Sequence, residues 1–123
     1  MTDAQTALSR RLVACKGWRW LQGCTARGQG VHEEGAECLY VCGHNDDTNV
    51  SFFLANPIPD LTDLATLGCL LALVREAYRD PYLCAVGDPD TGWRIDAVTA
   101  QVQDLHGYAS EAEALVFALE GAP

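Results

Sequence analysis

Three residues that could bind a metal ion fall close together in the middle of the chain: Cys38, Cys42 and His44. Thiolates and imidazoles are the ligands of structural zinc sites, and His32 or Cys24 could supply a fourth. The spacing is unfavourable, because zinc knuckles bring two cysteines together in a C-x-x-C turn, whereas residues 38 and 42 of a strand lie about 13 Å apart. We therefore expect no metal, with these thiols acting as small buried apolar groups.

Two further patterns could support enzymatic chemistry, and neither is complete. His32-Glu33-Glu34 matches the H-x-E half of a zinc deaminase signature, but no P-C-x-x-C follows it. Cys24 lies near Arg27, where a thiol could become nucleophilic, yet the sequence places no histidine base beside it. A small cysteine- or metal-dependent enzyme is one hypothesis, but the expectation is a protein without catalytic residues or a cofactor.

The glycine-rich segment 23–30 favours an anion site. It lacks the G-x-x-x-x-G-K-[ST] order of a P-loop. Glycine amides and the Arg27 guanidinium can nevertheless bind an anion. Further cations nearby in the sequence are Arg10, Arg11, Lys16 and Arg19.

Tryptophan and arginine occur together twice, in Trp18-Arg19-Trp20 and in Trp93-Arg94. In a strand, the first triplet would place both indoles on one face and the guanidinium on the other. The indoles either cover the core or are exposed, where they could stack on a flat base. Such a pocket would suit a nucleotide-type ligand, with its rings on tryptophan and its phosphate on arginine. The predicted ligand-binding residues are Trp18, Arg19, Trp20, Arg27 and Arg94.

The net charge of -9 is unevenly distributed along the chain. Residues 1–30 hold five of the eight basic residues and one of the seventeen acids, so this segment carries +4 and the rest -13. An acidic surface repels the phosphates of nucleic acids and membranes, so we expect neither direct nucleic-acid binding nor membrane binding. Such a surface could instead bind a basic protein. The candidate protein-binding residues are Glu33, Glu34, Glu37, Asp46 and Asp47.

The composition is that of one small globular domain spanning residues 1–123. Hydrophobic residues make up 49% of the chain and charged residues 20%, which is close to the average for folded proteins. The start has no basic and apolar leader, and no apolar run approaches the roughly 18 residues that cross a bilayer. The six cysteines lack the secretory context and regular spacing of a disulfide framework. We therefore expect a cytoplasmic protein with free thiols.

The first half of the chain predicts one helix and three strands. Apolar residues at positions 4, 8, 12 and 15 predict a helix over 3–15. Strand-forming residues follow, separated by polar loops over 23–30 and 43–49. The predicted strands cover 18–22, 38–42 and 50–55, and Pro57 and Pro59 would end the third.

The second half predicts a helix over 61–79, whose middle is apolar almost all round. This helix is either the central core helix or, in part, a homodimer contact. A hairpin over 82–86 and 93–98 follows, with an ambiguous edge strand over 100–105. Ser110 and Glu113 form a capping box for a last helix ending at residue 119. Together these elements predict an α+β fold, with an antiparallel sheet of about five to six strands, a buried central helix, and N- and C-terminal helices packed on the sheet.

The segment PDLTDLATLGCLLALVREAYRDP, residues 59–81, resembles a recurring segment of small accessory proteins of tailed phages and prophages. The segments 17–20 and 110–123 resemble flanking parts of the same group, so the likeness covers about half of the chain. The resemblance implies no activity, cofactor or site residue. It implies a context, because such proteins often act against host defence by binding a host protein or by sequestering a small signalling molecule.

Two functions therefore compete. In the first, a counter-defence protein sequesters a nucleotide-type signalling molecule in the tryptophan–arginine pocket. In the second, an acidic inhibitor occupies the basic groove of a host defence protein, in the manner of an anti-CRISPR protein. The uneven charge favours the first function, and the net charge favours the second.

Overall fold

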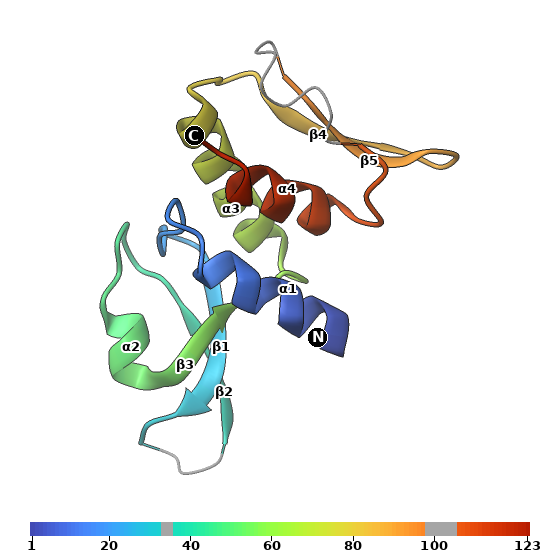
Figure 1. Cartoon of the computed structure of the whole chain (residues 1–123). Helices are drawn as coiled ribbons and strands as arrows, with labels where there is room; N and C mark the ends of the chain where they lie inside the picture. Colours follow the sequence, from blue (N-terminus) through green and yellow to red (C-terminus); the bar gives the residue numbers. More distant parts are fainter. Residues whose placement is uncertain (33–35, 98–105) are drawn as a thin grey trace. The chain divides into compact units, whose positions relative to one another are not determined.

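The computed structural model describes residues 1–32, 36–97 and 106–123, and the chain forms two compact units (Figure 1). Unit 1 comprises residues 1–14 and 19–69, and unit 2 comprises residues 15–18 and 70–123. The described residues form four helices and two antiparallel sheets, so the α+β class is confirmed. Their strands belong to one three-stranded and one two-stranded sheet, and the expected single sheet is not observed. None of the described helices has the length and apolarity needed to cross a bilayer.

Unit 1 contains a three-stranded antiparallel sheet in the order β2-β1-β3. The register of β1 with β3 shifts between Arg27 and Gln29. The boundary between the two units falls within α3, after Cys69. The elements that begin in this unit are α1 (Asp3–Val13), β1 (Thr25–Gly30), β2 (Glu37–Val41), α2 (Asn49–Phe53), β3 (Leu54–Pro59) and α3 (Leu64–Tyr78).

The central strand β1 occupies the segment expected to be a loop, and the expected strand over 18–22 is absent. One of the glycines that suggested a loop, Gly28, allows close strand packing instead. A Cβ atom on Gly28 would lie 2.8 Å from the carbonyl oxygen of Ala55 in β3. Glycine in a strand interior often marks such a close backbone approach. The neighbouring Ala26 is fully buried.

Residues 49–53 form the short helix α2, where a strand over 50–55 was expected. The strand β3 begins only at Leu54, and it includes Pro57 and Pro59, which were expected to end it. Proline is tolerated here because β3 is an edge of the sheet, where an N–H can be lost without breaking a ladder on both sides.

The helix α1 confirms the expected N-terminal helix. Thr2 and Gln5 form a capping box, in which the Gln5 amide donates to Thr2 Oγ1 at 3.1 Å and the Thr2 amide donates to Gln5 Oε1 at 2.8 Å. Leu8 and Leu12 are buried. The Ser9 hydroxyl donates to the carbonyl oxygen of Pro59 at 2.8 Å, which fastens α1 to the end of β3.

Unit 2 contains most of α3, the hairpin of β4 (Cys84–Asp88) and β5 (Gly92–Asp96), and α4 (Glu111–Glu120). The hairpin and the last helix were both expected. Ser110 caps α4 by accepting from the Glu113 amide at 3.1 Å, whereas the Glu113 carboxylate accepts from the Ala109 amide at 3.2 Å. The possible strand over 100–105 lies outside the described residues.

The helix α3 begins later than expected, after Asp63, whose carboxylate accepts from the Thr66 amide at 3.1 Å. Its buried side chains include Leu70, Val74 and Tyr78. Leu64, the first residue of the helix, is instead 82% exposed. The Tyr78 hydroxyl donates to the carbonyl oxygen of Ala118 at 2.7 Å, which joins α3 to α4 within unit 2.

Candidate functional site

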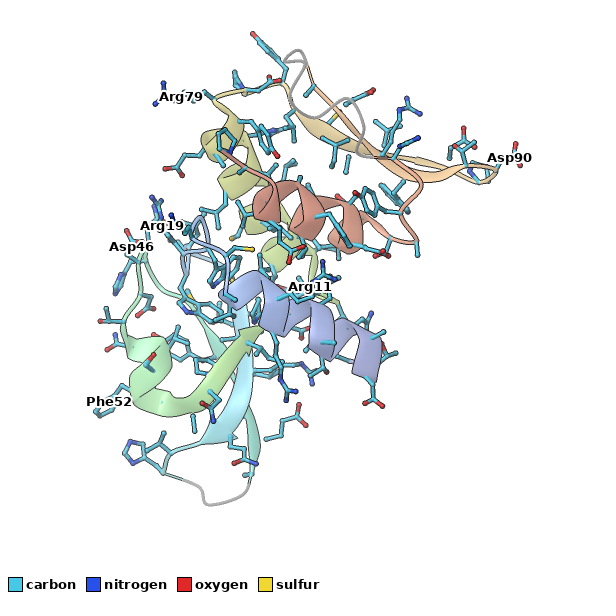
Figure 2. All side chains as sticks on the ribbon, viewed as in Figure 1. Arg11, Arg19, Asp46, Phe52, Arg79 and Asp90 are labelled. Carbon is cyan, nitrogen blue, oxygen red and sulfur yellow. The ribbon has the colours of Figure 1, made fainter. Side chains whose placement is uncertain are left out.

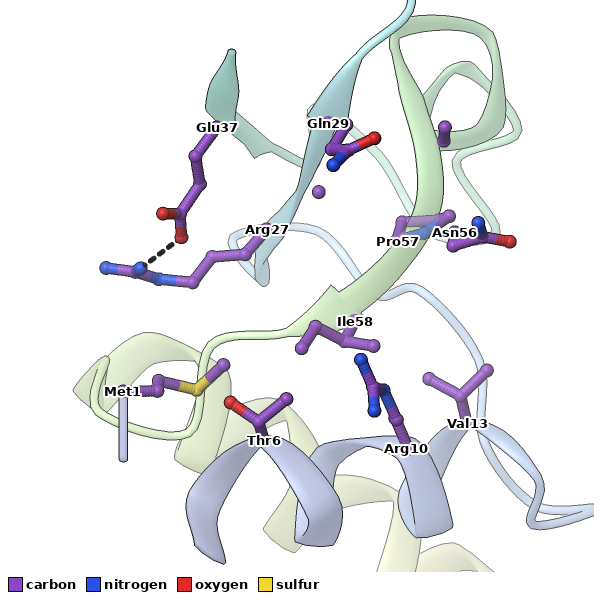
Figure 3. A pocket seen from close by; sticks show the side chains of 12 residues that line it. Met1, Thr6, Arg10, Val13, Arg27, Gln29, Glu37, Asn56, Pro57 and Ile58 are labelled. Atoms are coloured by element: carbon purple, nitrogen blue, oxygen red, sulfur yellow. Dashed lines mark hydrogen bonds and ion pairs between the residues drawn. The ribbon is translucent and has the colours of Figure 1, made fainter. Parts of the chain in front are cut away.

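An open groove of about 790 Å³ lies in unit 1 between α1 and the three-stranded sheet (Figure 3). We call it the arginine groove, because Arg10 enters it from α1 and Arg27 from β1. The helix side also contributes Thr6 and Val13. The remaining lining residues are Met1, Gly28, Gln29, Glu37, Ala55, Asn56, Pro57 and Ile58.

Arg27 is held in place by two carboxylates. Its Nε atom donates to Asp60 Oδ2 at 2.9 Å, and its Nη1 atom donates to Glu37 Oε1 at 2.7 Å. The side chain of Asp60 is 7% exposed, whereas that of Glu37 is 69% exposed. The bond to Asp60 raises the pKa of Arg27 above its usual value. Arg27 is therefore charged and oriented before any ligand arrives.

Asp60 is the fixed partner of this pair. Its Oδ1 atom accepts from the amide of Thr62 at 3.0 Å and from the Thr62 hydroxyl at 2.5 Å. Burial raises the pKa of Asp60, but the hydrogen bonds from Thr62 and Arg27 lower it by more and leave it below the usual value. Asp60 is therefore an ionised, nearly buried carboxylate that depends on Arg27 for its counter-charge.

Arg10 enters the groove from the second half of α1, on the side facing β3 (Figure 3). Its guanidinium has no hydrogen-bond or ion-pair partner among the described residues. Arg10 is an exposed residue, so its five N–H donors are available to a ligand. An anion in the groove could therefore interact with a cation from the helix and a cation from the sheet.

The rest of the groove offers an apolar wall and two amides. Val13, Pro57 and Ile58 supply the apolar surface. Gln29 and Asn56 each carry a side-chain carbonyl and a side-chain NH₂, which can accept and donate hydrogen bonds. A flat ring with polar edges is the kind of group that such a wall and such amides can bind.

The structure brings only one of the five predicted ligand residues, Arg27, into this groove. Arg19 is also in unit 1, but its Nε atom lies 3.3 Å from Asp46 Oδ1, and both side chains are exposed (Figure 2). Trp20 is half-buried in a segment without regular structure and does not line the groove. The expected arrangement of Trp18, Arg19 and Trp20 along one strand is therefore wrong.

The other two predicted ligand residues, Trp18 and Arg94, belong to unit 2. Arg94 lies in β5, and its Nε atom is 3.3 Å from Asp96 Oδ1 on the same strand. Both side chains of this pair are about half exposed, so the pair is screened by water. Neither residue lines the arginine groove.

The five residues of the predicted acidic surface do not form one free acidic patch among the described residues. Glu33 and Glu34 lie outside the described residues. Glu37 pairs with Arg27, and Asp46 pairs with Arg19. Asp47 requires a correction, because it is 2% exposed and is not a surface residue.

Asp47 instead organises the loop between β2 and α2. Its carboxylate accepts from the amides of Gly43 at 2.9 Å and Asn49 at 3.0 Å. It also accepts from the Tyr40 hydroxyl at 2.8 Å. Burial raises the pKa of Asp47, but these hydrogen bonds lower it by more, so the carboxylate stays ionised.

The cysteines are free thiols, and those in the core are poor nucleophiles. Cys24 is fully buried, and burial together with the nearby Cys42 raises its pKa to about 12. Burial raises the pKa of Cys42 to about 11. Cys38 is half-buried, and His44 is exposed and lies 3.6 Å from Asp47. The described residues contain no group of three histidine, cysteine or acidic side chains placed to hold a metal ion.

Sequence reasoning named Arg10 as one of several cations without placing it in a pocket. The helical spacing places Arg10 on the same side of α1 as Thr6 and Val13, away from the buried Leu8 and Leu12, but the element that faces this side is not visible in the sequence. Only the docking of α1 on β3 brings Arg10 and Arg27 to the same groove.

No protein-family model, curated protein or solved structure matches this chain. The resemblance to phage accessory proteins therefore stays a prediction, and the function must be argued from the groove itself.

Proposed function

We propose that this chain is a non-enzymatic binding protein whose arginine groove sequesters a small anionic ligand of the nucleotide type. In the context implied by the resemblance, it is a phage counter-defence protein that removes a host signalling molecule. The observation that supports this proposal best is Arg10, a guanidinium without a partner among the described residues that enters the same groove as Arg27.

The two arginines suit a phosphate group. A guanidinium can donate two parallel hydrogen bonds to phosphate oxygens, and such charge-assisted bonds are stronger than neutral ones. Asp60 already orients Arg27, which reduces the side-chain entropy that binding would remove.

The Glu37 carboxylate would compete with a phosphate group for the Arg27 guanidinium. It occupies one nitrogen of Arg27 at 2.7 Å, but its side chain is 69% exposed. Exposed ion pairs contribute only about 0–1 kcal/mol, so a phosphate can replace the Glu37 carboxylate at small cost. The buried Asp60 stays in place and keeps Arg27 oriented.

The rest of the groove suits the base and sugar of a nucleotide. The apolar wall of Val13, Pro57 and Ile58 can cover one face of a ring. The amides of Gln29 and Asn56 can bond to its polar edge. Binding without turnover is better supported than catalysis, because the pKa of the buried Cys24 thiol is raised far above neutrality.

The acidic-inhibitor function is less well supported by the described residues. Glu37 and Asp46 are paired with arginines, and Asp47 is buried. A basic partner would have to break the two ion pairs to use the exposed carboxylates.

The proposal is tested by thermal shift and calorimetry with nucleoside mono-, di- and triphosphates and cyclic mono- and dinucleotides. A ligand that binds only the native state raises the melting temperature. At a ligand concentration of one hundred times its Kd, the native state is stabilised by about 2.7 kcal/mol. Arg10→Ala removes one charged donor, and such bonds contribute about 1.5–3 kcal/mol, so the Kd should rise roughly 10- to 150-fold.

Two variants sharpen this test. Arg11→Ala removes the same charge from the next position of α1, which does not line the groove, and should leave the Kd nearly unchanged. Glu37→Gln removes the competing carboxylate and should tighten binding. A panel that gives no shift, or an Arg10→Ala protein that binds as tightly as Arg11→Ala, would contradict the proposal.

A further inference from the structure

The strand β2 is an open edge of the sheet in unit 1, and its backbone polarity can be read from the ladder. The Gly30 amide donates to the Ala36 carbonyl at 2.9 Å, and the Cys42 amide donates to the Cys24 carbonyl at 2.9 Å. In an antiparallel pair, alternate residues direct their backbone groups toward the partner strand. Even-numbered residues of β2 therefore face β1, and Glu37, Leu39 and Val41 direct their N–H and C=O groups away from it. No described strand pairs with that side.

This edge lacks most of the features that usually prevent strand pairing. Natural edge strands are protected by charged side chains, lysine above all, by proline, by a bulge or by an inward charge, and β2 carries only the charge of Glu37. The sequence of β2 is Glu-Cys-Leu-Tyr-Val, and its pairing with β1 has no register shift. Leu39 is 60% exposed and Val41 is 62% exposed. The outward backbone groups of β2 and the exposed side chains of Leu39 and Val41 are thus not paired with any other described strand.

We propose that β2 pairs antiparallel with β2 of a second copy of this chain, with the two-fold axis at Leu39. In this register Leu39 lies opposite Leu39 of the second copy, and Glu37 lies opposite Val41 of the second copy. All three residues direct their backbone groups outward, so each becomes part of a hydrogen-bonded pair. Such an interface is isologous, because both copies use the same residues.

The side chains fit this register. On one face, the two Leu39 side chains meet, and each Glu37 meets an apolar Val41 rather than the other Glu37. The two Glu37 residues lie four positions apart, about 13 Å along the strands, which exceeds the Debye length of about 8 Å at physiological salt. Each Glu37 is also paired with Arg27 of its own copy, an arginine that it shares with Asp60. On the other face, the small Cys38 lies opposite the large Tyr40.

Charge predicts how the dimer responds to salt. Each copy carries a net charge of -9, so the copies repel each other at long range. Two paired five-residue strands bury less surface than the roughly 1,200 Å² of the interfaces in stable complexes. We therefore expect a weak, concentration-dependent dimer that becomes tighter as salt screens the repulsion.

Sedimentation equilibrium tests the proposal, with Leu39→Pro as the first variant. Proline removes an N–H that points away from β1, so the internal ladder is retained and the dimer should dissociate to monomer. Leu64→Pro is the matched control, since it changes another exposed leucine at the first residue of α3, where proline is tolerated. Leu64→Pro should dimerise like the wild type, with circular dichroism confirming the fold of both variants.

A charge pair at position 39 tests the register itself. Leu39→Lys and Leu39→Glu should each be monomeric, because like charges would lie directly opposite each other. A mixture of the two should form heterodimers. The proposal is overturned if the wild type is monomeric at every soluble concentration and salt, if Leu39→Lys still dimerises, if Leu64→Pro alone dissociates the dimer, or if the mixture stays monomeric. If β2 pairs instead with an extended peptide of another protein, the purified wild type stays monomeric, and this result also overturns the proposal.

Discussion

The Nε atom of Arg27 lies 2.9 Å from Oδ2 of Asp60, and this ion pair joins the central strand β1 to the residue that follows β3. The carboxylate of Asp60 is nearly buried, whereas the guanidinium reaches the arginine groove. One pair therefore contributes both to the stability of unit 1 and to the orientation of the proposed ligand-binding group.

Arg27→Ala should destabilise the protein because it leaves a buried carboxylate without its counter-charge. Hydrogen bonds to charged groups contribute about 1.5–3 kcal/mol, so we expect a loss of about 2 kcal/mol in urea unfolding at neutral pH. Adding Asp60→Asn to Arg27→Ala should restore part of the lost stability, because the buried charge is then removed as well. Arg19→Ala, which removes an exposed pair with Asp46, should cost less than about 1 kcal/mol. Equal losses for the two arginine variants would show that the Arg27–Asp60 pair has no special role.

Stability should fall at acidic pH because the pKa of Asp60 is lower in the folded protein than in the unfolded chain. A lowered carboxylate pKa stabilises the fold above the unfolded value of about 3.9, and this contribution is lost as the pH falls through the folded value. Urea unfolding across this range should show a shallower pH dependence for Asp60→Asn. Asp90→Asn, at the exposed tip of the β4–β5 hairpin, serves as the surface control. An unchanged slope in Asp60→Asn would contradict the prediction.

Gly28→Ala and Gly68→Ala should change stability in opposite directions. At Gly28 a Cβ atom would lie 2.8 Å from the Ala55 carbonyl oxygen and 3.1 Å from Leu54 Cβ, so the strands must separate. We expect a loss of about 1–3 kcal/mol, as for other overpacked sites. At Gly68, on the exposed side of α3, an added Cβ atom would meet nothing within 4 Å apart from its own helix turn, and alanine should add roughly 0.5–1 kcal/mol through its helix propensity. Melting temperatures of both variants measure the contrast, and a stabilised Gly28→Ala would refute the proposed role of glycine in β1.

Cys24 and Cys42 should resist alkylation in the folded protein. Both are buried, and the pKa values are raised to about 12 and about 11, so almost no thiolate forms near neutral pH. Mass spectrometry after iodoacetamide treatment should show modification of half-buried cysteines such as Cys38 and Cys84 before Cys24 and Cys42. Modification of Cys24 should require urea. Rapid native labelling of Cys24 would instead support a reactive thiol and reopen the enzyme hypothesis.

Local patterns predicted the helices α1, α3 and α4 and the hairpin of β4 and β5, but not the helix α2. Leu8 and Leu12 define the buried side of α1, and Ser110 caps α4 through the Glu113 amide. The strands β4 and β5 are joined by a turn-rich connection that the sequence displays. These features were predictable because the interacting residues are only a few positions apart.

The strands of unit 1 could not be assigned from local patterns. Residues 25–30 have the composition of a loop, and they form the central strand because Gly28 lets the carbonyl of Ala55 approach. Pro57 and Pro59 suggest the end of a strand, but an edge position accepts them. Both results depend on contacts between residues about thirty positions apart, which propensity does not describe.

The sequence by itself determined the α+β class, the uneven charge and the presence of an arginine in the glycine-rich segment. Only the tertiary structure decided which charges are available: Arg19 and Arg94 pair with nearby acids, Asp47 is buried, and Arg10 enters the groove with Arg27. The physical reason is that a charged side chain acts through its partners and its exposure to water, and both are set by residues that the fold brings together from distant positions.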